Sequence, residues 1–231
     1  MQPQKLGIIF DGGGFLGAHS IGFLRAVEDF GLLPPAYCQG VSVGAITASK
    51  LVEMGGTNSQ ILEQLWLDVE AQGPQALFSK YGFLWRAFSA HLFSNRGIWR
   101  LIDMLDAPAV IRSPVHLDIV TIREQTTSHK IFTNRDMLFQ QKPELIKHAV
   151  LASTAIPGFL PAVSVAGRAY SDGRYISLQR AIDFGCDWIF VFFNIPRNRA
   201  WKTAHPEYDH WKKRLLDMST GDRVAIEELR R

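Results

Sequence analysis

The sequence predicts an α/β protein, a three-layer α/β/α sandwich with a mainly parallel central sheet. The chain opens as strand, helix, strand, helix with tight connections, a pattern that pairs strands in parallel. A strongly apolar run at 187–195 is typical of a strand buried in such a sheet. The 231 residues, 47% hydrophobic and 20% charged, suffice for one domain with a sizeable core.

The elements are predicted from hydrophobic periodicity and from turn residues. Strands are expected at 6–10, 35–41, 115–122, 128–134, 168–172 and 187–195. Helices are expected at 15–31, 42–56, 143–156 and 176–186. A helical, unusually aromatic insert is expected at about 58–114. We interpret 1–231 as a single domain, with a core at about 6–194 and a helical C-terminal tail at 195–231.

Bulk composition excludes several classes of protein. A net charge of +3 is too mild to indicate nucleic acid binding, so no nucleic acid partner is expected. Two cysteines do not make a disulfide framework, and the histidines suggest no metal-ligand pairing, so we expect no metal. Without a long apolar span or a leader segment, a cytoplasmic protein is the default expectation, and peripheral contact with a membrane is compatible with it.

Residues 40–44, with the sequence GVSVG, form a G-x-S-x-G motif between a predicted strand and a predicted helix. That context suits a nucleophile elbow, in which the serine stands on a sharp, strained turn. The following helix directs its positive N-terminal end at developing negative charge. Ser42 is therefore the candidate nucleophile, although the same five residues also arise by chance around a serine N-cap.

A glycine run, DGGGFLG at 11–17, follows the first strand and opens the first helix. Its exposed backbone amides suit either a dinucleotide pyrophosphate or the oxyanion of an acyl intermediate. A dinucleotide site needs an acidic residue at the end of the second strand, and this chain has Gln39 and the elbow there. We therefore favour an oxyanion hole and keep a nucleotide-binding α/β module as the less favoured alternative.

A serine nucleophile needs a base within hydrogen-bond reach. A Ser–Asp–His triad is formally possible with Asp172 and either His205 or His210. Both histidines lie in a polar terminal stretch, however, and the elbow follows only the second strand. The triad is the less favoured option.

Four segments together resemble the patatin-like phospholipases over about 6–194. They are DGGGFLG (11–17), GVSVGA (40–45), ASTAIPGFLPAV (152–163) and YSDG (170–173). The resemblance implies a Ser–Asp dyad in which Ser42 is the nucleophile and Asp172 the base. It also implies an oxyanion hole formed by the backbone amides of Gly12, Gly13 and Gly14.

The function implied by the resemblance is hydrolysis of acyl esters of phospholipids, lysophospholipids or related lipids, with no metal or organic cofactor. Two positions depart from the family pattern: Leu16 stands where Arg or Lys is usual, and Arg174 where Gly or Ala is usual. An ion pair between Arg174 and Asp172 would weaken the base. A lipid-binding homologue with impaired catalysis is therefore the main alternative, and an outward-pointing Arg174 that meets phosphate is another reading. The aromatic segment 76–93 is expected either to cover the sheet or to form a lid over acyl chains.

Overall fold

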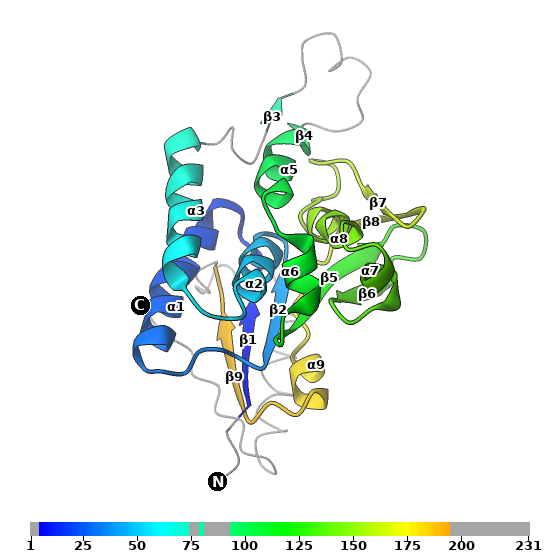
Figure 1. Ribbon diagram of the computed structural model, residues 1–231. Coiled ribbons are helices and arrows are strands. Elements are labelled where there is room, and N and C mark those ends of the chain that lie inside the picture. Colours follow the sequence, from blue (N-terminus) through cyan, green and yellow to red (C-terminus); the bar gives the residue numbers. More distant parts are fainter. Residues whose placement is uncertain (1–4, 74–78, 81–92, 195–231) are drawn as a thin grey trace, which may run out of the picture.

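A computed structural model of the protein describes residues 5–73, 79–80 and 93–194 (Figure 1). A seven-stranded sheet occupies its centre, and most of the helices pack on one face of that sheet. In Figure 1, α2 and α6 lie in front of the strands, α1 lies to their left, and α9 lies near the lower end of the sheet.

The sheet is mixed. Four strands run parallel in the spatial order β9 (Trp188–Phe192), β1 (Leu6–Phe10), β2 (Tyr37–Val41) and β5 (His116–Arg123). Three further strands are antiparallel to their neighbours: β6 (His129–Thr133) pairs with β5, β8 (Arg168–Asp172) also pairs with β5, and β7 (Val163–Val165) pairs with β8. Because β1 and β2 are adjacent and parallel, the loops that follow them meet at one edge of the sheet.

Strand β8 continues the line of β2 along the same side of β5. Residues 118–120 of β5 pair with both β2 and β6, so those two strands flank β5 on opposite sides. Residues 121 and 122 pair with both β6 and β8, which places β8 on the side of β2. Val41 is opposite Val120, and Asp172 is opposite the next residue, Thr121. The end of β8 therefore meets the end of β2.

Helices cover the two faces of the sheet unequally. The larger apolar core lies under α1 (Ser20–Asp29), α2 (Val43–Glu53), α3 (Ser59–Gln72), α5 (Arg96–Asp103), α6 (Ala107–Arg112) and α8 (Leu145–Ser153). On the other face, a smaller cluster packs Ile9 and Ile189 against Leu178 and Ala181 of α9 (Leu178–Asp183). The α/β/α layering predicted from the sequence is thus present, with a thin second helical layer in the described part of the chain.

The elements match the sequence-based expectations with several differences. Helix α7 (Met137–Gln141) and strand β7 were not anticipated, and the helix expected at 15–31 begins as a short 3₁₀ helix, η1 (Gly14–His19). The expected helical insert also contains a two-stranded ribbon, β3 (Ser79–Lys80) and β4 (Phe93–Ser94). Strand β9 ends the sheet order, so its residues are less buried than a central strand would be.

Two predicted segments lie outside the described residues. They are the tail at 195–231 and nearly all of the aromatic segment 76–93. Within 5–73, 79–80 and 93–194, no helix combines the length and the apolar character needed to cross a membrane.

Candidate active site

Ser42 occupies the turn between β2 and α2, with backbone angles φ 56° and ψ −129°. A serine in this left-handed region is strained, as a nucleophile elbow requires. The flanking glycines make the turn possible by close backbone contact. A Cβ on Gly44 would lie 2.3 Å from the Phe10 carbonyl oxygen, and a Cβ on Gly40 would lie 2.3 Å from the Gly44 carbonyl oxygen. Helix α2 can therefore start directly against β1, which leaves the Ser42 side chain at the sheet edge.

Ser153, at the end of α8, holds the elbow to the neighbouring strand. Its hydroxyl accepts a 2.9 Å hydrogen bond from the Ser42 amide and donates a 2.7 Å bond to the Val120 carbonyl oxygen of β5. Ser153 is fully buried. Ser153 lies in the segment 152–163, which resembles the family pattern, but no signal in the sequence indicated this role for it. A single hydroxyl thus stabilises the strained turn by satisfying two buried backbone groups.

Asp172 lies at the end of β8, beside the elbow. Its amide donates to the Ala155 carbonyl oxygen at 3.0 Å, and its Oδ1 accepts from the Arg174 amide at 2.8 Å. Its carboxylate is also within hydrogen-bonding reach of the Ser42 side chain. The two residues that the sequence paired are therefore neighbours, because β8 ends where β2 ends.

The pKa of the Asp172 carboxyl is raised above its ordinary value. Burial is the main cause, since the side chain is 7% exposed and its charged form loses hydration. Hydrogen bonds from the Arg174 amide and from Ser42 oppose the shift, and the charge of Arg174 adds a smaller opposing effect. A carboxylate that is poorly hydrated and more basic than usual is suited to accept a proton.

The ion pair between Arg174 and Asp172 that the sequence left open is not formed in the described structure. The Arg174 side chain is exposed. Only its backbone amide bonds the carboxylate. Arg174 has φ 60°, a left-handed conformation that explains why glycine suits this position better than arginine.

The glycine run lies against the elbow. A Cβ on Gly12 would be 3.2 Å from the Ser42 Cβ. The Gly12 amide donates to Asp11 Oδ1 at 2.9 Å, so Asp11 helps to order the loop. Among the described residues, no acceptor is found for the amides of Gly13 and Gly14. The run thus offers two free donors near the nucleophile, whereas the Gly12 donor is already engaged.

Asn194, just after β9, fixes this glycine loop from the other side, and nothing in its local sequence indicated that. Its Nδ2 donates to the Asp11 carbonyl oxygen at 2.6 Å, and a Cβ on Gly13 would lie 2.5 Å from the Asn194 Cβ. Asn194 is 2% exposed. A residue almost at the end of the described chain therefore shapes a loop near its beginning.

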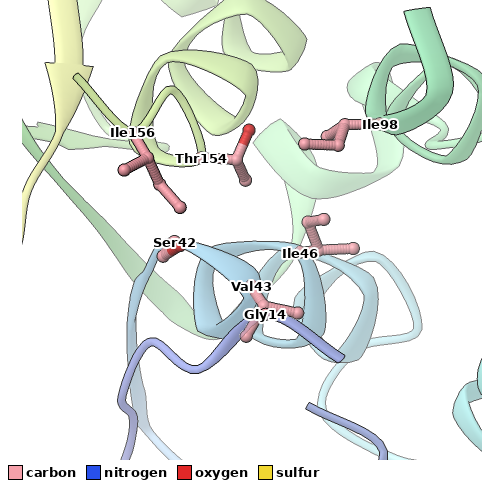
Figure 2. A pocket seen from close by; sticks show the side chains of 7 residues that line it. All are labelled: Gly14, Ser42, Val43, Ile46, Ile98, Thr154 and Ile156. Carbon is pink, nitrogen blue, oxygen red and sulfur yellow. The ribbon is translucent and has the colours of Figure 1, made fainter. Parts of the chain in front are cut away.

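A small apolar hollow, partly open to solvent, lies in front of Ser42. Figure 2 shows Val43 and Ile46 on the helix that follows Ser42, with Ile98 and Ile156 across the hollow and Gly14 at its base. Thr154 and Ser42 supply the hydroxyl groups in its lining. A wall made mostly of branched aliphatic side chains favours an acyl chain over a charged ligand.

The described part of the site holds neither a metal-binding cluster nor a histidine base. Within the described residues, no group of three or more His, Cys, Asp or Glu side chains could hold a metal. His205 and His210, the candidates for a triad, lie outside those residues, as does the side chain of Leu16. The described residues thus bring together the serine, one carboxylate and the glycine loop.

Comparison with known proteins adds a family and a fold. A family model described as patatin-like phospholipase matches residues 8–177, a range that contains Ser42, Asp172 and the glycine run. The chain is similar in structure to VipD from Legionella pneumophila, with a TM-score of 0.50 and 13% sequence identity. The similarity covers 94% of this chain and 56% of that one, so this chain spans little more than half of VipD. Among curated proteins, none matches the sequence.

Proposed function

Since the chain belongs to the patatin-like phospholipase family, and is thus a lipid acyl hydrolase in general terms, we propose that Ser42 and Asp172 form its catalytic dyad. The observation that carries the proposal is the contact between the Ser42 side chain and a buried carboxylate of raised pKa. A weakly hydrated carboxylate gains most from taking up the proton that a serine must lose.

In the first half-reaction, the Ser42 Oγ attacks the ester carbonyl carbon while Asp172 accepts the hydroxyl proton. The carbonyl oxygen becomes an oxyanion, which the free amides of Gly13 and Gly14 stabilise together with the N-terminal end of α2. Collapse of the intermediate breaks the ester bond, and the departing alcohol takes the proton from Asp172.

In the second half-reaction, water attacks the acyl-enzyme and gives its proton to Asp172. Collapse then releases the fatty acid and returns the proton to the Ser42 Oγ, so the dyad ends as it began. Gly12 joins the oxyanion hole only if its amide leaves Asp11 Oδ1 during the reaction.

The hollow in front of Ser42 supports a lipid ester as the substrate class. Its aliphatic lining suits the acyl chain of a phospholipid, a lysophospholipid or a related lipid ester. The exposed cation of Arg174, two residues from the base, is placed to meet an anionic head group. A lipid substrate also implies that the protein touches a membrane surface transiently to reach it.

Covalent labelling tests the nucleophile. A fluorophosphonate probe should modify the wild type at Ser42, whereas Ser42→Ala should not react. Ser49→Ala is the matched control. Ser49 is a buried serine of α2, the helix that follows Ser42, and its hydroxyl has no partner in the described structure. A folded protein in which Ser42 stays unlabelled would contradict the proposal.

Ester turnover tests the base. Asp172→Asn should reduce hydrolysis of p-nitrophenyl esters by about 10² to 10⁴, the usual contribution of a positioned base. Turnover at the wild-type rate would exclude Asp172 from that role. Vesicle or fatty-acid binding without any turnover by the wild type would instead select the lipid-binding alternative.

A further inference from the structure

Gln39 forms a buried bridge between the two chain segments that carry the dyad. Its side chain is fully buried in β2. Its Nε2 donates to the Ser177 carbonyl oxygen at 2.9 Å, and its Oε1 accepts from the Ser177 amide at 2.6 Å. The side-chain amide thus pairs with both backbone groups of one residue.

The two ends of this bridge are close to the two catalytic groups in sequence. Gln39 lies three residues before Ser42, on the strand that ends in the elbow, and Ser177 lies five residues after Asp172, at the N-cap position of α9. Among the described residues, Gln39 makes both of these bonds from β2 to the end of the loop that follows the base. The bridge therefore fixes the end of that loop to the nucleophile strand.

The loop at 173–177 in turn orients the base. Asp172 is held at its start by pairing with Thr121, and the loop folds back so that the Arg174 amide bonds Asp172 Oδ1. Inside the loop, the Tyr175 amide donates to the Gly173 carbonyl oxygen at 2.7 Å. A loop fixed at both ends keeps the Arg174 amide where it holds the carboxylate, whereas a loop free at Ser177 could let that amide drift away.

A separate arm of the same polar cluster holds α9 to the sheet. Gln39 Nε2 also donates to the Tyr37 hydroxyl at 2.7 Å, and that hydroxyl donates to Asp118 Oδ2 at 2.9 Å. Asp118 also accepts from Arg180 of α9. Because this arm contacts α9 beyond Ser177, the contributions of the two arms can be separated by mutation.

We propose that Gln39 is a positioning residue of the dyad, which sets the orientation of Asp172 toward Ser42 through the backbone of Ser177. The inference rests on the proposed function, since it assigns a role within that dyad. Gln39 touches no reacting atom. Its effect is transmitted by the loop at 173–177.

The test compares Gln39→Met with Gln179→Met in ester turnover. Gln179 is an exposed glutamine of α9 whose side chain, within the described part of the chain, bonds only Asp183, so its change should leave turnover unaltered. Gln39→Met should lower kcat about ten- to a hundredfold with KM changed less than about twofold, the scale of loss expected from a misplaced catalytic group. A kcat per folded molecule equal to that of the wild type would overturn the proposal.

The pH profile gives a readout that a purely structural role would not move. When the loop is released, loss of the Arg174 amide would raise the pKa of Asp172, but entry of water relieves burial, which is the largest of the effects on that pKa and the one that raises it. The acid limb of kcat/KM for Gln39→Met should therefore shift to lower pH. Tyr37→Phe, which breaks the other arm, should lower the unfolding temperature and leave that limb in place. An acid limb that is the same in Gln39→Met and in the wild type would count against positioning.

Gln39→Asn covers the case in which the methionine variant does not fold. The shorter amide still satisfies Tyr37 but withdraws from Ser177, so kcat should fall and the fold should remain. Asparagine with wild-type kcat and an unshifted acid limb would contradict the proposal. The proposed function fails separately, when the wild type itself is neither labelled at Ser42 nor active on esters.

Discussion

At the scale of single residues, Asp172 serves two opposing requirements. Burial makes its carboxylate basic, but burial also makes the charged form costly to the folded protein. The Arg174 amide and the Ser42 side chain recover part of that cost by hydrogen bonding. The pKa of Asp172 nevertheless stays raised, so its ionised form lowers the stability of the folded protein, as catalytic groups often do.

The cost of the buried charge predicts that Asp172→Asn is more stable than the wild type at pH 7. Because the folded state holds the proton more tightly than the unfolded chain, ionising Asp172 costs stability as the pH rises from the ordinary carboxyl pKa of about 4 through the raised one. Asparagine keeps an acceptor for the Arg174 amide and carries no charge. The unfolding temperature should therefore rise at pH 7, and the difference should vanish below about pH 4. A variant less stable than the wild type at pH 7 would contradict this account.

At the scale of elements, the site is assembled at the ends of three strands. β1 ends in the glycine loop, β2 ends in the elbow, and β8 ends in the base. A fourth strand contributes through Asn194, which follows β9 and bonds the carbonyl of Asp11. The glycine loop is thus held between its own strand and the end of an adjacent one.

Asn194→Ala should weaken this loop and with it the oxyanion hole. The change removes a buried hydrogen bond and the packing against Gly13, so the free energy of unfolding should fall by about 1 kcal/mol. Ester turnover should fall by about tenfold, less than the 10² to 10³ expected when a donor itself is lost. Asn194→Asp separates the two causes, because it keeps the packing but places an acceptor against the Asp11 carbonyl. Unchanged turnover in both variants would show that Asn194 does not contribute to the activity of the site.

The sequence predicted the parts of the site that depend on local pattern. The elbow at Ser42 follows from five residues in a strand–turn–helix context, and Asp172 follows from a short family motif. The contacts of Ser153, Gln39 and Asn194 join residues 111, 138 and 183 positions apart. No periodicity or motif in a single sequence encodes such pairs, because they depend on how strands are ordered in the sheet. The antiparallel pairing of β8 with β5, which brings the base to the nucleophile, could not be predicted for the same reason.

At the scale of the whole molecule, the two faces of the sheet are held by different means. The face under α1, α2 and α8 has a large apolar core, whereas the face under α9 has a small one supplemented by buried polar contacts. Asp118 is the centre of those contacts: the Tyr37 hydroxyl, His116 Nε2 and Arg180 Nε each lie 2.9 Å from its oxygens. Charge pairing therefore compensates for the limited apolar burial beneath α9.

Asp118→Asn should consequently destabilise the protein by about 3 kcal/mol, the lower end of the usual cost of breaking a buried pair, because Arg180 is partly exposed. Burial alone would raise the pKa of Asp118, but hydrogen bonds and charge from His116 and Arg180 hold it below its ordinary value. The lowered pKa means that ionised Asp118 favours folding above about pH 4, and that this contribution is lost as the pH falls through the lowered pKa. Unfolding temperatures of the two proteins should accordingly differ most near neutral pH and converge in acid.

Asp183→Asn, the same change at an exposed position of α9, should alter stability by less than about 0.5 kcal/mol. Equal effects of the two substitutions would show that the Asp118 contacts do not hold α9.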